Sequence, residues 1–151
     1  MSAPPQGLGA MYLQKCHDMG ITPNTVLASQ FSSPTMPERF DFHTNYIGDR
    51  GVLALCEVLK NVPRITAINI KDNGIRNAGI ISLVEVLKKH PTLVSLDISC
   101  NQISDTGGLA VLDLLKSNQN LVELEFYNNR VEANVRLKIK KALEENKARP
   151  H

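Results

Sequence analysis

The chain has 151 residues, of which 42% are hydrophobic, and a formal net charge of +2. This length and apolar content are sufficient for one domain with a buried core, and the small net charge excludes recognition of a partner by global electrostatics alone. No stretch approaches the roughly 18 consecutive apolar residues that a transmembrane helix needs, so we expect no membrane span.

The N-terminal part of the sequence predicts a short helical unit in front of the remaining chain. We expect a flexible N-terminus at residues 1–9 and a helical cap with its connector at residues 10–35. The segment MYLQKCHDMG places Tyr12, Cys16 and Met19 on one helical face, which indicates that this helix packs against the residues that follow.

From residue 36 onward, one pattern returns every 28 residues without insertions. Its four occurrences are PERFDFHTNYIGDRG, ITAINIKDNGIRNAG, LVSLDISCNQISDTG and LVELEFYNNRVEANV. In each, apolar residues alternate as in a strand and are followed by an asparagine; these asparagines are Asn45, Asn73, Asn101 and Asn129. A fixed period of about 20 to 50 residues is typical of a stacked repeat architecture.

The second half of each unit has the apolar spacing of an amphipathic helix. In the first unit this apolar stripe consists of Leu53, Leu55, Cys56 and Leu59. The equivalents in the next two units are Ile81, Leu83, Val84 and Leu87, then Leu109, Val111, Leu112 and Leu115. Before each helix stands one polar residue (Asp49, Asn77 or Asp105), whose side chain we expect to accept hydrogen bonds from the first backbone amides of the helix.

The full pattern, L-x-x-L-x-L-x-x-N-x-[IV]-x-x-x-G-x-x-x-L, resembles the leucine-rich repeats of the ribonuclease-inhibitor type. The resemblance covers four repeats at residues 36–147. It implies an α/β solenoid, a short right-handed arc with a parallel sheet on its concave side and helices on its convex side. In that family the asparagines form a ladder that hydrogen-bonds the backbone where each strand ends. Such a ladder would satisfy polar groups that are costly to bury unpaired.

The two ends of the expected solenoid differ from its middle, because terminal repeats have a neighbour on one side only. Val135 replaces the recurring glycine, and Lys140 occupies the position of Cys56. We therefore predict that the fourth repeat acts as a C-terminal cap, followed by a tail at residues 148–151. At the other end, the Y-x-x-x-C pattern of the helical cap is similar to segments that precede the repeats in some leucine-rich proteins of cilia and the cytoskeleton.

Residue types that carry catalysis or bind metals do not form a recognisable set in the sequence. The four histidines are scattered, so we expect no metal site, no cofactor and no enzyme activity. Cys100 could be a reactive thiol, but it lacks an activating partner in the sequence, and a small residue beside the asparagines is the alternative. The three cysteines form no disulfide framework, and the start of the chain lacks the features of a secretory signal. We expect a cytoplasmic protein, with association with the cytoskeleton or the cilium as the alternative.

The residues that alternate with the apolar strand positions are expected to face the concave side. Two interpretations stay open: these are ordinary solvated strand residues, or they form a surface for a basic protein segment, with an aromatic anchor of the kind enriched at binding hot spots. Acidic residues outnumber basic ones on this side. The predicted partner-binding residues are Arg39, Asp41, His43, Asn69, Lys71, Asp97, Ser99, Glu123, Glu125 and Tyr127.

The last predicted helix carries the opposite charge. Between Arg136 and Arg149 there are six basic and two acidic side chains. Such a helix can bind phosphates or acidic protein tails, or it is the solvated face of a cap with cations near its C-terminus. No aromatic residue for base stacking lies in it, which argues against a nucleic-acid partner.

These observations predict a non-enzymatic protein–protein interaction module, a monomer without a membrane anchor that binds another protein through its concave side. Two alternatives stay open. Some members of the family regulate small GTPases, although such regulators generally carry more repeats, and a GTP-turnover assay would separate the two functions. The second alternative is a cytoskeletal or ciliary subunit that uses the basic C-terminal helix.

Overall fold

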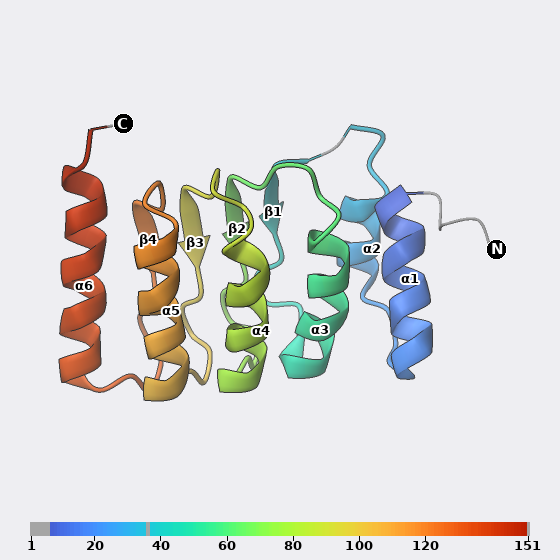
Figure 1. The fold of residues 1–151 in the computed structure, drawn as a ribbon. Helices are drawn as coiled ribbons and strands as arrows, with labels where there is room; N and C mark the ends of the chain where they lie inside the picture. The colour runs from blue at the N-terminus through green and yellow to red at the C-terminus, as the bar shows by residue number, and fades with distance from the viewer. Residues whose placement is uncertain (1–6, 36, 151) are drawn as a thin grey trace.

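The computed structural model describes residues 7–35 and 37–150. Two helices precede four strand–helix units that follow one another in chain order (Figure 1). The two helices are α1 (Gly7–Met19) and α2 (Thr25–Phe31). The units are β1 (Arg39–Asp41) with α3 (Gly48–Leu59), β2 (Ala67–Asn69) with α4 (Asn77–Leu87), β3 (Ser95–Asp97) with α5 (Asp105–Ser117), and β4 (Glu123–Glu125) with α6 (Ala133–Ala148).

The four strands form one parallel sheet in the order β1-β2-β3-β4. Phe40 pairs with Ile68, Ile68 with Leu96, and Leu96 with Leu124, so the 28-residue period of the sequence is the register of the sheet. The helices form a second layer on one side of the strands (Figure 1). The predicted α/β repeat solenoid is confirmed.

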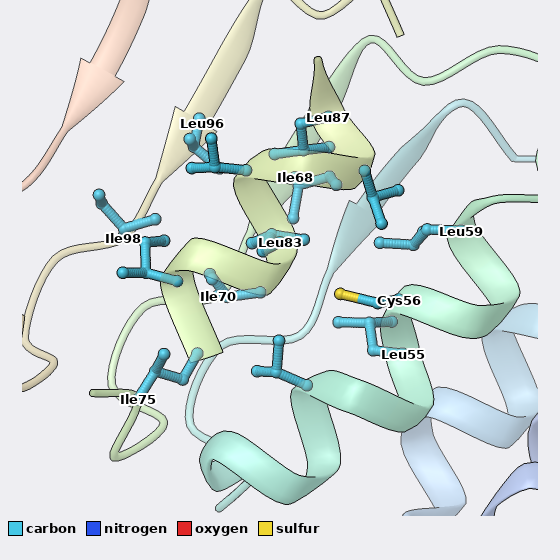
Figure 2. Packing of buried hydrophobic residues seen from close by; sticks show 14 of the residues in the cluster. Leu55, Cys56, Leu59, Ile68, Ile70, Ile75, Leu83, Leu87, Leu96 and Ile98 are labelled. Carbon is cyan, nitrogen blue, oxygen red and sulfur yellow. The ribbon is translucent and has the colours of Figure 1, made fainter. Parts of the chain in front are cut away.

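The core lies between these two layers. Figure 2 shows Ile68 and Ile70 from the second repeat in one cluster with Leu83 and Leu87 of α4, and all four are at most 2% exposed. Because every repeat supplies the same apolar positions, the cluster continues along the whole solenoid.

One row of the predicted helical stripes lies outside this core. Leu53, Ile81 and Leu109 are 45%, 36% and 47% exposed, and Leu137 of α6 is 66% exposed. The spacing of apolar residues in the sequence predicts a broad apolar stripe on each helix that includes these residues. In the structure, the buried part of each helix is narrower and leaves them out. The row therefore lies on the solvent side of the helices.

The asparagines bind backbone groups where each strand ends. The Asn101 side-chain amide donates to the carbonyls of Ile70, Ile98 and Ser99 at 3.0–3.1 Å. Its oxygen accepts from the amides of Asn73 and Ile75 at 3.0 and 3.1 Å. Asn73 makes the equivalent bonds one repeat earlier, to groups that include the Phe42 carbonyl at 3.0 Å and the Asn45 amide at 2.8 Å. Asn73, Asn101 and Asn129 thus each join two adjacent repeats, as the repeat pattern predicts. Asn45 of the first repeat does not: its side-chain amide donates to the His43 carbonyl, and its oxygen accepts from the Asn24 side chain before β1.

The polar residues predicted to precede the helices lie in the first turn of α3, α4 and α5, and they bond differently from the prediction. Asp49, Asn77 and Asp105 were expected to cap the helix of their own repeat, but each side-chain oxygen accepts from the next repeat instead. The donors are the amides of Arg76 at 2.8 Å, Ser104 and Gly107 at 3.0 and 3.1 Å, and Glu132 at 2.8 Å. The stacking of the repeats places the first backbone amides of one helical segment next to the polar side chain of the preceding repeat, and that side chain accepts their hydrogen bonds.

A further set of buried polar residues connects the other ends of the helices. His90, Asn118 and Asn146 are 7%, 3% and 2% exposed. The Asn118 amide donates to the Leu87 carbonyl at 2.7 Å, and the Asn146 amide donates to the Leu115 carbonyl at 3.0 Å. These bonds satisfy the last carbonyls of the preceding helix, which have no partner within that helix.

The N-terminal helices cover the first strand. Phe31 of α2 packs against Phe40 and Phe42 with ring centroids 5.6 and 5.7 Å apart, and Tyr12 of α1 lies 5.7 Å from Phe31. Burial raises the pKa of Tyr12 to about 12, and its hydroxyl accepts from the Asn24 amide at 2.9 Å. Helix α1 begins at Gly7, whereas the sequence placed the start of the cap at residue 10; residues 1–6 lie outside the described chain.

The C-terminal end has an exposed lysine where earlier repeats have an apolar residue. Lys140 is exposed, whereas Cys56 and Val84 at the equivalent positions are 5% and 1% exposed.

We predict that Lys140→Leu causes self-association without unfolding, because an apolar patch would replace a charge at the end of the solenoid. Light scattering measures this. Lys147→Leu, the same change in the last turn of α6, should leave the chain monomeric; a monomeric Lys140→Leu protein at high concentration would contradict the prediction.

Candidate functional site

The candidate binding surface is the side of the sheet that faces away from the helices. It contains a groove of about 450 Å³ across all four strands. Its polar lining consists of Arg39, Asp41, Asn69, Ser95, Asp97, Glu123 and Glu125. The structure therefore brings together most of the predicted partner-binding residues, because side chains at alternate positions of parallel strands in register point to the same side. Ala67 is only 7% exposed and forms part of the floor.

Ser99 was predicted to be accessible to a partner, and this is wrong. Ser99 is 0% exposed, and its hydroxyl has no hydrogen-bond partner among the described residues. The residues at the equivalent position of the adjacent repeats are Lys71 and Tyr127. Their side chains contact each other: the Lys71 ammonium lies 5.2 Å from the centre of the Tyr127 ring. A short side chain between two long ones that contact each other is covered by them. The contact with Tyr127 also raises the pKa of Lys71.

The last residue of each of the first three strands has a local structural role besides its place in the groove. The side-chain oxygens of Asp41, Asn69 and Asp97 each accept from the backbone amide two residues later, at 3.2, 3.0 and 3.0 Å. Short Asp and Asn side chains form this bond readily at strand ends and turns. A local hydrogen bond to the backbone therefore accounts for an Asp or Asn at each of these three positions.

Asp41 also interacts with another predicted site residue, His43. The His43 Nδ1 atom lies 2.6 Å from an Asp41 carboxylate oxygen. Partial burial would raise the pKa of the Asp41 carboxyl, but the hydrogen bonds from His43 outweigh it and lower the pKa below its ordinary value. This pair lies at the β1 end of the sheet.

Two carboxylates on neighbouring strand positions lie at the opposite end of the groove. Glu123 and Glu125 are exposed on β4, and neither has an ion-pair partner within the described residues. Leu124 between them points into the core and is 5% exposed. Two neighbouring carboxylates on a rigid strand attract a cationic group without any rearrangement of the backbone.

The side chains that could bind a metal ion or act as nucleophiles do not come together among the described residues. Among the described residues, no cluster of histidine, cysteine and carboxylate side chains could hold a metal ion. Burial raises the pKa of the Cys56 thiol to about 12, so this thiol is unreactive. Cys100 is half-exposed, and the side-chain amide of Asn128 lies 3.5 Å from its sulfur. Within the described part of the chain, no helix is both long and apolar enough to cross a membrane.

A second hollow was missed by the sequence analysis. It has a volume of about 520 Å³ and lies at the C-terminal end of the solenoid, between the segment after β4 and helix α6. Arg136, Leu137 and Lys140 line it from α6. The charge of α6 was visible in the sequence, but the proximity of this helix to the end of β4 follows only from the folded arrangement.

Comparisons with known proteins agree with this geometry. The family model described as a leucine-rich repeat matches residues 89–112, and no curated protein matches the sequence at a significant level. The C-terminal domain of tropomodulin from Caenorhabditis elegans is similar in structure, with a TM-score of 0.59, 17% sequence identity, and coverage of 82% of this chain and 92% of that chain. Actin-binding site 2 of leiomodin-1 is similar with a TM-score of 0.64, 17% identity, and coverage of 83% and 91%. Because the sequence identity is low, these structural similarities show a shared fold alone.

Proposed function

Since the chain is a leucine-rich repeat protein, we propose that it is a non-enzymatic interaction module that binds a basic protein segment in its concave groove. The observation that carries the proposal is the pair of exposed carboxylates of Glu123 and Glu125, which have no ion-pair partner among the described residues. The sheet fixes the backbone of both residues, so binding needs to order only their side chains. Lys71 and Tyr127, which follow Asn69 and Glu125 two residues later, contact each other but do not line this groove.

Association with the actin cytoskeleton is the second candidate. It is supported by the similarity in fold to leiomodin-1 actin-binding site 2. The basic side chains of α6 would complement an acidic patch on an actin filament. Co-sedimentation of the purified chain with filaments tests this candidate: salt-sensitive binding that Lys141→Glu weakens would support it, and recovery of the chain only in the supernatant would exclude it.

Glu125→Lys should weaken partner binding by about tenfold or more at low salt, because it replaces one of the two carboxylates that attract the basic segment by a cation that repels it. The melting temperature should change little, because the Glu125 side chain is exposed and its replacement creates no cavity. The measurement is quantitative affinity capture from an extract of the source cells, at two salt concentrations, followed by mass spectrometry.

The matched control is Lys141→Glu, a charge reversal on an exposed residue of α6. It should leave concave-face binding nearly unchanged. A partner that tolerates Glu125→Lys but is lost with Lys141→Glu would move the site to the basic helix and overturn the proposal.

A further inference from the structure

The outer edge of β4 repeats a hydrogen-bonding pattern that the earlier strands use to join the next repeat. The amides of Phe42, Ile70 and Ile98 donate to carbonyls of the following repeat at 2.8–2.9 Å. The amides of Thr44, Asp72 and Cys100 do the same two residues later, at 2.9–3.0 Å. In the other direction, the carbonyls of Thr66 and Val94 each accept two amides from the following repeat.

In the described chain, no further strand lies beside the equivalent groups of the fourth repeat. By the 28-residue register, the donors are the amides of Phe126 and Asn128, and the acceptor is the Val122 carbonyl. Within the described residues, none of these three groups has a backbone partner. An edge strand with open donors and acceptors in this spacing is a template for an added strand.

The hollow at the C-terminal end lies directly beside this edge. Phe126, Val131 and Leu137 give it apolar walls, and Leu137 is 66% exposed. Arg136 and Lys140 are its charged lining residues, and no carboxylate lines it. The hollow therefore favours a ligand that combines an apolar side chain with negative charge.

We propose that the C-terminal end of the solenoid binds an extended segment of a partner protein, which adds beside β4 as a fifth parallel strand. Backbone carbonyls of the segment accept from the amides of Phe126 and Asn128, and its amides donate to the Val122 carbonyl. One apolar side chain enters the hollow beside Leu137. Aspartate or glutamate residues that follow it pair with Arg136 and Lys140.

This surface is distinct from the concave groove, and the inference does not depend on the proposed function. An added strand also presents side chains to the concave side, next to Glu123 and Glu125, where acidic residues would be repelled. The segment therefore has no acidic residues at those positions, and its acidic residues follow the strand. This order of residue types distinguishes the expected partner from a uniformly acidic tail.

The probe is a synthetic peptide in which threonine and valine alternate before two aspartates. The measurement is the amide proton–nitrogen spectrum of the intact isotope-labelled chain during titration, which detects even weak binding. We expect the Phe126 and Asn128 amides to shift and their hydrogen exchange to slow at least about tenfold, as amides do when they enter a hydrogen bond. N-methylation of the peptide amides that face Val122 should abolish these changes.

Arg136→Glu should weaken binding of the peptide about tenfold, because it reverses one of the two cations in the hollow. Lys138→Glu, the same change on an exposed residue of α6 that does not line the hollow, should have little effect. Three results would overturn the proposal: an unchanged spectrum at millimolar peptide, shifts confined to residues of the concave groove, or equal sensitivity to both variants. Concentration-dependent shifts of Phe126 and Asn128 without peptide would also overturn it, since a second copy of the chain would then occupy the edge.

Discussion

Leu83→Ala should lower the free energy of unfolding by about 2–5 kcal/mol, the range for removal of a buried leucine side chain. Leu83 is 0% exposed and lies in the middle of the repeat array, where it packs in the cluster shown in Figure 2. Neighbouring repeats on both sides limit the collapse of the cavity, because each of them is itself closely packed. Equilibrium unfolding in urea measures the effect.

The matched control is Ile81→Ala, two residues earlier on the same helix. Sequence spacing places both residues on one apolar stripe, but Ile81 is 36% exposed. Its replacement should cost clearly less than that of Leu83. Equal losses for the two variants would contradict the orientation of α4 relative to the sheet.

Asn101→Ala should lower the free energy of unfolding by about 1–3 kcal/mol, because it leaves buried backbone groups without partners. Five groups lose a bond: three carbonyls that accept from the side-chain amide and two backbone amides that donate to its oxygen. These groups belong to two adjacent repeats, so the loss also weakens the interface between them. Thermal and urea unfolding should agree on the direction of the change.

Gln102→Ala is the comparison for this variant, since it removes a neighbouring amide side chain from the same loop. The Gln102 oxygen accepts one exposed bond from Arg76 at 3.2 Å, so its loss should change stability by no more than about 0.5 kcal/mol. An Asn101→Ala protein as stable as the parent would show that the asparagine ladder contributes nothing to the fold.

The fold could be predicted from the sequence because its register repeats without insertions. Phe40, Ile68, Leu96 and Leu124 stand 28 positions apart in the chain and are direct partners in the sheet. Bonds between repeats were harder to predict. A polar residue such as Asn77 before a helix indicates a cap, and only the folded chain shows that it bonds to the next helix.

The candidate site was predictable in position but not in detail. Alternation along each strand placed Asp97 and Glu125 on the concave side, where the groove lies. Alternation could not show that Lys71 and Tyr127 contact each other or that Ser99 is buried, since both depend on side-chain length and rotamer. The hollow beside Leu137 was missed for a similar reason, because it lies between two elements and has no periodic signal.

Site-specific photo-crosslinking tests most directly whether a protein partner occupies the concave groove. The crosslinking amino acid is placed at Ser95 in the middle of the groove and, in a separate protein, at Leu109 on the helical side. After illumination in an extract of the source cells, the account predicts a crosslinked partner from position 95 that excess unmodified chain competes away and that Glu125→Lys reduces. A partner captured only from position 109, or one from position 95 that ignores Glu125→Lys, would contradict it.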